Sequence, residues 1–235
     1  MNNGILYLVP SSLGESPPER CFPPVNAKII GNIRHFIVEE IRTARRFLKK
    51  VCPDIVIDDL TFYLHNEHNT NADNTLLLLP ALNGQDMALL SEAGIPCVAD
   101  PGSEIVRLAH ESGIRVVPLV GPSSLLLALM SSGFNGQQFV FHGYLPIDKA
   151  ARTRKLKELE EAINKNDQTQ IIIETPYRNV QLFKAIIETC HESILLCLAT
   201  SLTTAEESIR TYPVGKWKEM EPDIQKKPTV FLLYR

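Results

Sequence analysis

The chain has 235 residues, of which 44% are hydrophobic, enough for a sizeable core in one large or two small domains. Charged residues make up 22%, as in ordered soluble proteins, and no apolar run approaches the roughly 20 residues that a membrane helix needs. The net charge of −3 gives no overall attraction to nucleic acid, and the first residues lack the positive charge of a secretory signal, so we expect a cytoplasmic protein without membrane contact.

The first 145 residues alternate between short apolar runs and helical segments. Pro10 stops the first run, and Ser103 and Gly113 are expected as the cap and the end of one helix. The expected strands are 5–9, 35–38, 61–64, 86–90, 114–117 and 139–142, and the expected helices are 27–30, 39–50, 75–82, 103–112 and 124–132. This alternation is typical of an α/β domain with a largely parallel sheet.

The pattern changes around residues 143–149, where we expect a domain boundary. A strongly charged helix follows over 150–164, opened by the basic residues Lys149, Arg152, Arg154, Lys155 and Lys157. The remaining segments predict a helix over 177–190 and strands over 170–174, 194–199, 208–212 and 229–234. We therefore expect one α/β domain over residues 1–145 and a second over residues 146–235.

The most unusual segment is the connection over 91–102, between an expected buried strand and an expected helix. Two glycines and two prolines fix an irregular backbone there. The connection is also longer than the usual length of about 2–6 residues. Such a loop can present backbone N–H and C=O groups to a ligand at the carboxyl edge of a sheet, and a plain strand-to-helix connection is the alternative.

A second special turn, Val117-Pro118-Leu119-Val120-Gly121-Pro122-Ser123-Ser124, joins the next strand to the next helix. Ser123 or Ser124 has a simpler interpretation as a helix cap. In a parallel sheet both connections leave from the same edge, where Pro10 ends the first strand. Three special turns at one edge predict a shared ligand pocket.

Other common sites have no signature in this sequence. It contains no P-loop, no GxGxxG dinucleotide turn and no GxSxG nucleophile motif. Of the histidines, only His65 and His68 have a metal-like spacing, and no metal site is expected. The cysteines are odd in number and lack CxxC spacing, which predicts reduced thiols at Cys21, Cys52, Cys97, Cys190 and Cys197.

Taken together, the loops resemble the tetrapyrrole methylase superfamily, and most closely its ribosomal RNA small subunit methyltransferase I branch, which 2′-O-methylates a cytidine. The segment over 89–102 is similar to the S-D-A-G-x-P-x-x-x-D-P-G pattern of that branch, and the similarity continues over 113–124 and 139–146. Weaker similarity extends to Glu174-Thr175-Pro176-Tyr177-Arg178, Ser201-Leu202-Thr203 and His65-Asn66-Glu67.

The resemblance implies a two-domain α/β fold, with a mainly parallel sheet in the first domain, a mixed sheet in the second, and S-adenosylmethionine in the cleft between them. It also implies a methyltransferase that acts on ribosomal RNA or the small ribosomal subunit and works as a homodimer. Carried over by position, the cofactor-binding residues are Pro10, Gly94, Ile95, Val98, Ser123, Ser124, Tyr177, Leu202 and Thr229.

Three segments depart from the branch, and they lie on loops expected to face the substrate. They are Val9-Pro10-Ser11-Ser12-Leu13-Gly14-Glu15 in place of T-P-x-G-N-L, Glu39-Glu40-Ile41-Arg42 in place of E-D-T-R, and Ser201-Leu202-Thr203-Thr204 in place of E-L-T-K. Two alternatives therefore stay open. In the first, the chain methylates a tetrapyrrole or another small molecule. In the second, it is a diverged cofactor-binding protein without activity.

Methyl transfer to a ribose hydroxyl requires a base for the departing proton. The sequence offers Glu39, Glu40, Glu92 and Asp100 without choosing among them, and we expect Glu92 and Asp100 to shape the cofactor loop. Phosphate contacts are available from the basic run over 149–157 and from Arg42, Arg45, Arg46, Lys49 and Lys50. Solvated helix faces are the alternative for both basic groups.

Overall fold

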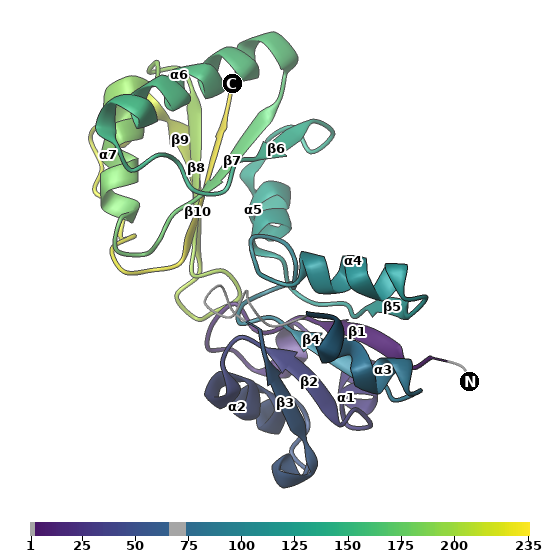
Figure 1. The fold of residues 1–235 in the computed structure, drawn as a ribbon. Coiled ribbons are helices and arrows are strands. Elements are labelled where there is room, and N and C mark those ends of the chain that lie inside the picture. The colour runs from purple at the N-terminus through teal and green to yellow at the C-terminus, as the bar shows by residue number, and fades with distance from the viewer. Residues whose placement is uncertain (1–2, 66–73) are drawn as a thin grey trace. The chain divides into compact units, whose positions relative to one another are not determined.

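A computed structural model of the chain describes residues 3–65 and 74–235. The chain forms two compact units, Met1–Ser123 and Ser124–Arg235, and each has a five-stranded sheet of its own (Figure 1). Within the described ranges, no helix has the length and apolar character needed to cross a membrane. The α/β class predicted from the sequence is confirmed in both units.

The sheet of the first unit is parallel throughout, with the strand order β3-β2-β4-β1-β5. Its strands are β1 (Ile5–Val9), β2 (His35–Val38), β3 (Thr61–Leu64), β4 (Met87–Leu90) and β5 (Arg115–Pro118). Every residue of β4 is buried, which explains why this strand is a continuous apolar run instead of an alternating one. Parallel pairing places the carboxyl ends of all five strands at one edge.

Helices cover both faces of this sheet. On one face, α1 (Pro24–Ile30) and α2 (Ile41–Val51) pack on a core that includes Phe36 and Leu48. On the other face, α3 (Leu79–Leu82) and α4 (Ser103–Glu111) pack on a core that includes Ile37 and Ile105. Two short 3-10 turns, Pro18–Arg20 and Ile57–Asp59, lie in the connections.

Two local predictions in the first unit were wrong. The expected helix over 75–82 is a 3-10 turn over Asn74–Leu78 followed by the single turn of α3, because Pro80 has no backbone N–H to donate to a continuous α-helix. Ser103 is not the cap of α4. The capping position is Gly102, whose φ of 115° allows the sharp entry and which supplies no side-chain hydrogen bond.

The second unit has a mixed sheet in the order β6-β7-β10-β8-β9, as the resemblance implied. Only β6 and β7 are parallel, and the other pairs are antiparallel. The strands are β6 (Phe139–Phe141), β7 (Thr169–Ile173), β8 (Leu195–Thr200), β9 (Ser208–Pro213) and β10 (Thr229–Tyr234). The helices are α5 (Ser124–Ser132), α6 (Lys149–Asn166), α7 (Asn179–Thr189) and α8 (Val214–Trp217).

The boundary between the units lies earlier than predicted. It falls between Ser123 and Ser124, not between residues 145 and 146, so α5 and β6 belong to the second unit. The physical reason is pairing and packing: β6 pairs with β7, and α5 packs against β8, β9 and β10. Thr211 of β9 also donates a hydrogen bond of 3.0 Å to the carbonyl oxygen of Ser132 at the end of α5.

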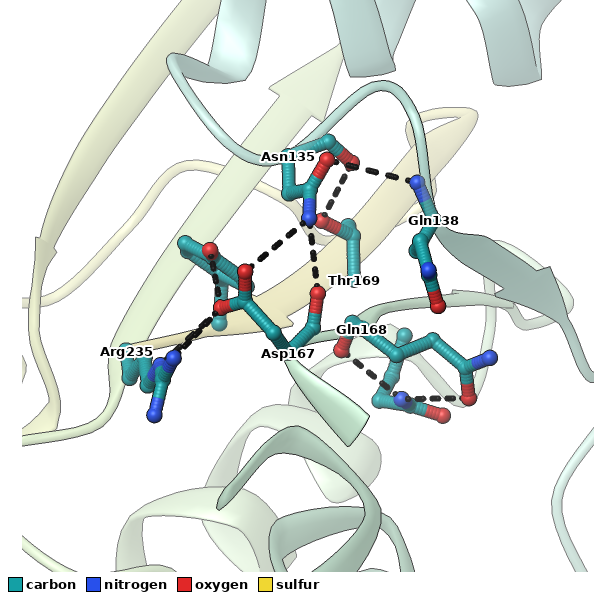
Figure 2. A network of polar contacts seen from close by, with 8 residues as sticks. Asn135, Gln138, Asp167, Gln168, Thr169 and Arg235 are labelled. Atoms are coloured by element: carbon teal, nitrogen blue, oxygen red, sulfur yellow. Dashed lines mark hydrogen bonds and ion pairs between the residues drawn. The ribbon is translucent and has the colours of Figure 1, made fainter. Parts of the chain in front are cut away.

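A polar network fixes the segment before β6 to the same unit (Figure 2). Asp167, which follows α6 with a φ of 53°, is at its centre. The Asn135 amide donates to the Asp167 carbonyl oxygen at 2.7 Å, and Thr169 Oγ1 donates to the Asn135 carbonyl oxygen at 2.9 Å. Tyr234 and Arg235 donate to Asp167 Oδ1 at 2.6 and 2.7 Å, which ties the last residues to this turn.

Candidate functional site

The carboxyl edge of the first sheet brings the three predicted turns together. β1 lies between β4 and β5, so the residues that follow these strands are neighbours. Ser11 N donates to the carbonyl oxygen of Gly94 at 2.8 Å, and Gly94 N donates back to the carbonyl oxygen of Ser11 at 3.3 Å. A Cβ placed on Gly94 would lie 3.3 Å from the carbonyl oxygen of Pro122, so the third turn lies against the same glycine.

Two glycines permit this close approach. Gly94 has a φ of +80°, and an added Cβ would lie 3.0 Å from Leu13 Cδ2. At Gly121 an added Cβ would overlap the ring of Pro10, so Pro10 packs directly on the glycine backbone. Any larger residue at either position would push the turns apart, which explains why glycine occupies both.

The connection from β4 to α4 is strained at two residues that nothing in the sequence marks. Cys97 and Ala99 have φ values of 67° and 56°, in the left-handed region that side chains disfavour. Each such conformation costs on the order of 1–3 kcal/mol, and it persists where the surroundings impose it, often in loops that bind ligands. Burial raises the pKa of the Cys97 thiol to about 11, so this cysteine is not a reactive thiolate.

The predicted cofactor residues of the first unit all lie in these turns. Pro10, Gly94 and Ser123 are buried, Ile95 is half-buried, and Val98 is 44% exposed. The turns therefore combine backbone groups with apolar side chains that remain accessible to a ligand. This combination suits the flat, weakly polar rings of a nucleoside.

Asn26 is a supporting residue that sequence reasoning missed. It is 2% exposed, and its amide donates to the Val120 carbonyl oxygen at 2.7 Å. This bond anchors the turn after β5 to α1. The only signal in the sequence was a polar residue on a short helix, which is more often solvated than buried.

The four remaining cofactor candidates lie in the second unit. Ser124 begins α5. Leu202 and Thr229 are brought together, since Thr229 pairs in register with the last residue of β8 and Leu202 follows two residues later. Leu202 and Thr229 are each 5% exposed, whereas Tyr177, in the turn before α7, is 81% exposed. Tyr177 is thus far more exposed to solvent than Leu202 and Thr229.

The turn after β8 is strained in the same way as the turn after β4. Ser201 and Thr203 have φ values of 50° and 68°. Glu207 accepts a hydrogen bond of 2.6 Å from Thr203 N, which holds the turn. Thr203 Oγ1 is buried and has no hydrogen-bond partner in the part of the chain that the structure describes. A buried hydroxyl without a partner is costly, so this turn is also suited to a polar ligand.

The side chains of Glu39 and Asp100 form a hydrogen bond. Glu39 follows β2, and Asp100 lies in the connection after β4, which is the neighbouring strand. Burial raises the pKa of Asp100, and a hydrogen bond with Glu39 opposes that rise. The pair thus lies at the same sheet edge as the three turns.

The other two carboxylates considered as bases already have structural partners. Glu40 is the cap of α2, where its side chain accepts a hydrogen bond of 3.0 Å from Arg42 N. Glu92 Oε1 accepts a hydrogen bond of 2.7 Å from Thr43 Oγ1 and so links the connection after β4 to α2. The role of Glu92 in shaping the cofactor loop stays a prediction.

A cavity of about 270 Å³ opens beside the Gly94 turn. The connection after β1 leads to α1 on one face of the sheet, and the connection after β4 leads to α4 on the other, which leaves a crevice between the two strand ends. Ser11 Oγ is buried here without a hydrogen-bond partner among the described residues. Residues that line the cavity include Ser11, Ser12, Thr43, Arg46, Lys50 and Ser91.

Metal ligation has no support in the described residues. His65 is buried, and its Nε2 lies 3.2 Å from Glu104 Oε1. Its partner in the sequence pattern, His68, lies outside the described residues. Over residues 3–65 and 74–235, no three His, Cys, Asp or Glu side chains gather in a way that could hold a metal ion.

The sequence is similar to known methyltransferases. The family model described as Tetrapyrrole (Corrin/Porphyrin) Methylases matches residues 26–216. A relative from Escherichia coli O157:H7, named Ribosomal RNA small subunit methyltransferase I, is 35% identical over 175 residues, which are 73% of this chain and 59% of the relative. The protein of the same name from Vibrio cholerae serotype O1 is 31% identical over 234 residues, 97% of this chain and 76% of the relative. The chain spans less than two thirds of the Escherichia coli protein.

Solved structures with the same fold are also methyltransferases. The crystal structure of the methyltransferase CobJ has a TM-score of 0.62 at 17% identity and covers 99% of this chain and 94% of its own. The uroporphyrin-III-C-methyltransferase from Thermus thermophilus has a TM-score of 0.55 at 17% identity, and the match covers 98% of this chain and 92% of that protein. At this level of identity the likeness establishes the fold of the chain.

Proposed function

The chain belongs to the tetrapyrrole methylase family, and from this premise we propose that it transfers a methyl group from S-adenosylmethionine to an RNA of the small ribosomal subunit. Members of this family use S-adenosylmethionine as methyl donor. The observation that carries the proposal is the convergence of three glycine- and proline-shaped turns at the carboxyl edge of the first sheet.

The residues present fit the cofactor. A Cβ at Gly94 would fill the space between Leu13 and Pro122, so the glycine keeps a backbone surface open at this point. Pro10, Gly94, Ile95, Val98 and Ser123 would hold the adenosyl group at the carboxyl edge of the first sheet, and cofactor contacts of Ser124, Leu202 and Thr229 stay predictions. When bound, S-adenosylmethionine supplies an activated methyl group on its sulfonium, which leaves the protein to position the reactants and exclude water.

Proton removal from an acceptor hydroxyl falls to the Glu39 and Asp100 pair in this proposal. A base is needed near the acceptor when the new bond forms. Of the four carboxylates considered, Glu40 caps α2 and Glu92 bonds to Thr43, whereas Glu39 and Asp100 contact each other at the sheet edge that carries the turns. The raised pKa of Asp100 favours acceptance of a proton at this pair.

A ribosomal RNA acceptor is supported by the relatives, whose names specify the small-subunit RNA. A 2′-hydroxyl of a cytidine is the acceptor atom implied by the resemblance, and we keep it as part of the proposal. The crevice beside Gly94 supports it too, since its lining includes hydroxyl groups and Arg46 that could contact a ribose and its phosphate, beside the carboxylates of Glu15 and Glu92. Methylation of a tetrapyrrole or another small acceptor is the competing outcome.

The test is calorimetric titration of the full chain with S-adenosylmethionine and its demethylated product, followed by methyl transfer to isolated small ribosomal subunits. We expect saturable binding of both compounds and label incorporated at a ribose 2′-oxygen. Label in a tetrapyrrole but not in the subunits would replace the proposed acceptor. Cofactor binding without transfer to any of these acceptors would support a non-catalytic protein, and absence of binding would refute the proposal altogether.

A further inference from the structure

A groove on the second unit has no part in the proposed cofactor and base sites, although Tyr177, one of the cofactor candidates, lines it. It lies between α6 and α7, has a volume of about 460 Å³, and is called the α6–α7 groove here. Lys149 and Arg152 line it from α6, Lys184 lines it from α7, and Tyr177 lies in the turn that precedes α7. The groove also contains the amide side chain of Gln181.

The charges of the groove favour an anionic ligand. Three cationic side chains, Lys149, Arg152 and Lys184, line it together with a single carboxylate, Glu188. The whole chain has a net charge of −3, so this excess of positive charge is local. No hydrogen bond or ion pair joins Lys149 or Lys184 to another side chain in the described residues. Both ammonium groups are therefore available to a phosphate.

Arg152 gives the strongest sign that something binds here. It is 7% exposed, and its guanidinium donates one hydrogen bond of 3.0 Å, to the Ile147 carbonyl oxygen. Its Nε is buried without a partner, and no carboxylate pairs with it among the described residues. A buried cation without a counter-ion is unfavourable, and an anion in the groove would supply the missing partner.

Tyr177 adds an aromatic surface at the rim of the groove. Its side chain is 81% exposed, whereas the turn that carries it is held firmly. Arg178 Nη2 lies 2.6 Å from Glu174 Oε1, Arg178 N donates to Thr175 O at 2.9 Å, and Lys226 N donates to Pro176 O at 3.0 Å. A rigid turn that presents an exposed ring beside cations is the arrangement that single-stranded nucleic acids use for stacking and phosphate contacts.

We propose that the α6–α7 groove binds a single-stranded segment of the RNA substrate, with Lys149, Arg152 and Lys184 on its phosphates and Tyr177 stacked on a base. This inference rests on the proposed function, because it takes the acceptor to be RNA. It assigns Tyr177 to the substrate instead of the cofactor. Single-stranded RNA is favoured over a free anion, since a free phosphate has no base that could stack on the exposed ring of Tyr177.

The test measures fluorescence anisotropy of a labelled single-stranded RNA with the full chain over a series of salt concentrations. The double variant Lys149→Ala/Lys184→Ala should weaken binding about tenfold or more and lower the slope of log K against log salt by about 1.4, or about 0.7 for each lost phosphate contact. Tyr177→Ala should weaken binding by about 5- to 150-fold, and Tyr177→Phe should bind like the wild type, because the ring is kept.

The matched control is Lys157→Ala/Lys165→Ala, which removes two exposed lysines of the same helix outside the groove and should leave the slope unchanged. All variants should bind the demethylated cofactor product as the wild type does. Wild-type RNA affinity in the Lys149/Lys184 and Tyr177→Ala variants, with methylation intact, would overturn the inference and leave the proposed function standing. Failure of the wild type to bind or methylate RNA would overturn both.

Discussion

Gly94 is the residue on which the proposed cofactor site depends most. It forms both hydrogen bonds of the bridge to Ser11, and the turn of Pro122 lies against it. Its importance could be predicted from the sequence, since a glycine two residues before a proline in a long connection indicates a required backbone shape. The strain at Cys97 and Ala99 could not be predicted, because neither residue type favours a positive φ and only tertiary packing imposes it.

Gly94→Ala should reduce affinity for the demethylated cofactor product about tenfold or more, because the added Cβ would push Leu13 and Pro122 away. Gly133→Ala is the matched control, since Gly133 has a φ of +82° but nothing within 4 Å of an added Cβ. Both variants should lose about 1–2 kcal/mol of stability from the left-handed backbone alone. Calorimetry that finds equal cofactor affinity in the two variants would contradict the role of Gly94.

Asp100 should make stability depend on pH in a definite direction. Its pKa is raised in the folded protein from the ordinary value of 3.8, so its stabilising contribution is complete below that value and is lost as the pH rises through the raised pKa. Asp100→Asn cannot ionise and should escape this loss. The stability difference between the variant and the wild type, measured by urea unfolding over a pH range that begins at 3.8, should therefore grow as the pH rises. A difference that is constant over this range would contradict the raised pKa.

Among the secondary-structure elements, the ones marked by composition were predicted best. The bounds of α5 and β10 agree with the predicted ranges, since an apolar segment lies between clear turn residues in each case. The segment over 75–82 shows the limit of this approach. Its apolar periodicity is that of a helix, but the missing N–H of Pro80 divides it into a 3-10 turn and a single α-turn.

The long α6 helix depends on its first turn. Asp148 precedes the helix, and its Oδ1 accepts a hydrogen bond of 2.8 Å from Ala151 N. Asp148→Ala should lower the free energy of unfolding by about 1 kcal/mol, because a backbone donor at the helix start loses its partner. Asp148→Asn keeps an acceptor and should stay close to the wild type in thermal denaturation. If both variants lose the same stability, the carboxylate charge and not the cap bond stabilises α6.

At the level of the whole molecule, the two-unit organisation was predictable but the boundary was not. The change in charge pattern at Lys149 is visible in the sequence, and it suggested a boundary at residue 145. Membership of α5 and β6 in the second unit depends on long-range contacts: the pairing of β6 with β7 and the network around Asp167. Such contacts leave no local pattern in the sequence, so only the structure places the boundary at Ser123.

Assembly as a homodimer stays a prediction, and α5 offers a surface for it. The helix is apolar on most of its circumference, yet Met130 is 78% exposed. An apolar helix with an exposed side is usually covered by a partner. Sedimentation equilibrium should give twice the chain mass of 26.3 kDa for the wild type and the single-chain mass for Met130→Glu. A wild type that sediments at 26.3 kDa would exclude the dimer.

The central claim is that the turns around Gly94 and Ser123 cradle an adenosyl group. A crystal structure of the full chain with the demethylated cofactor product tests it most directly. We predict density for the adenosine against the backbone of Gly94 and Ile95, with Val98 and Ser123 in contact. Density for the ligand at any other place, with these turns in contact only with one another, would contradict the account.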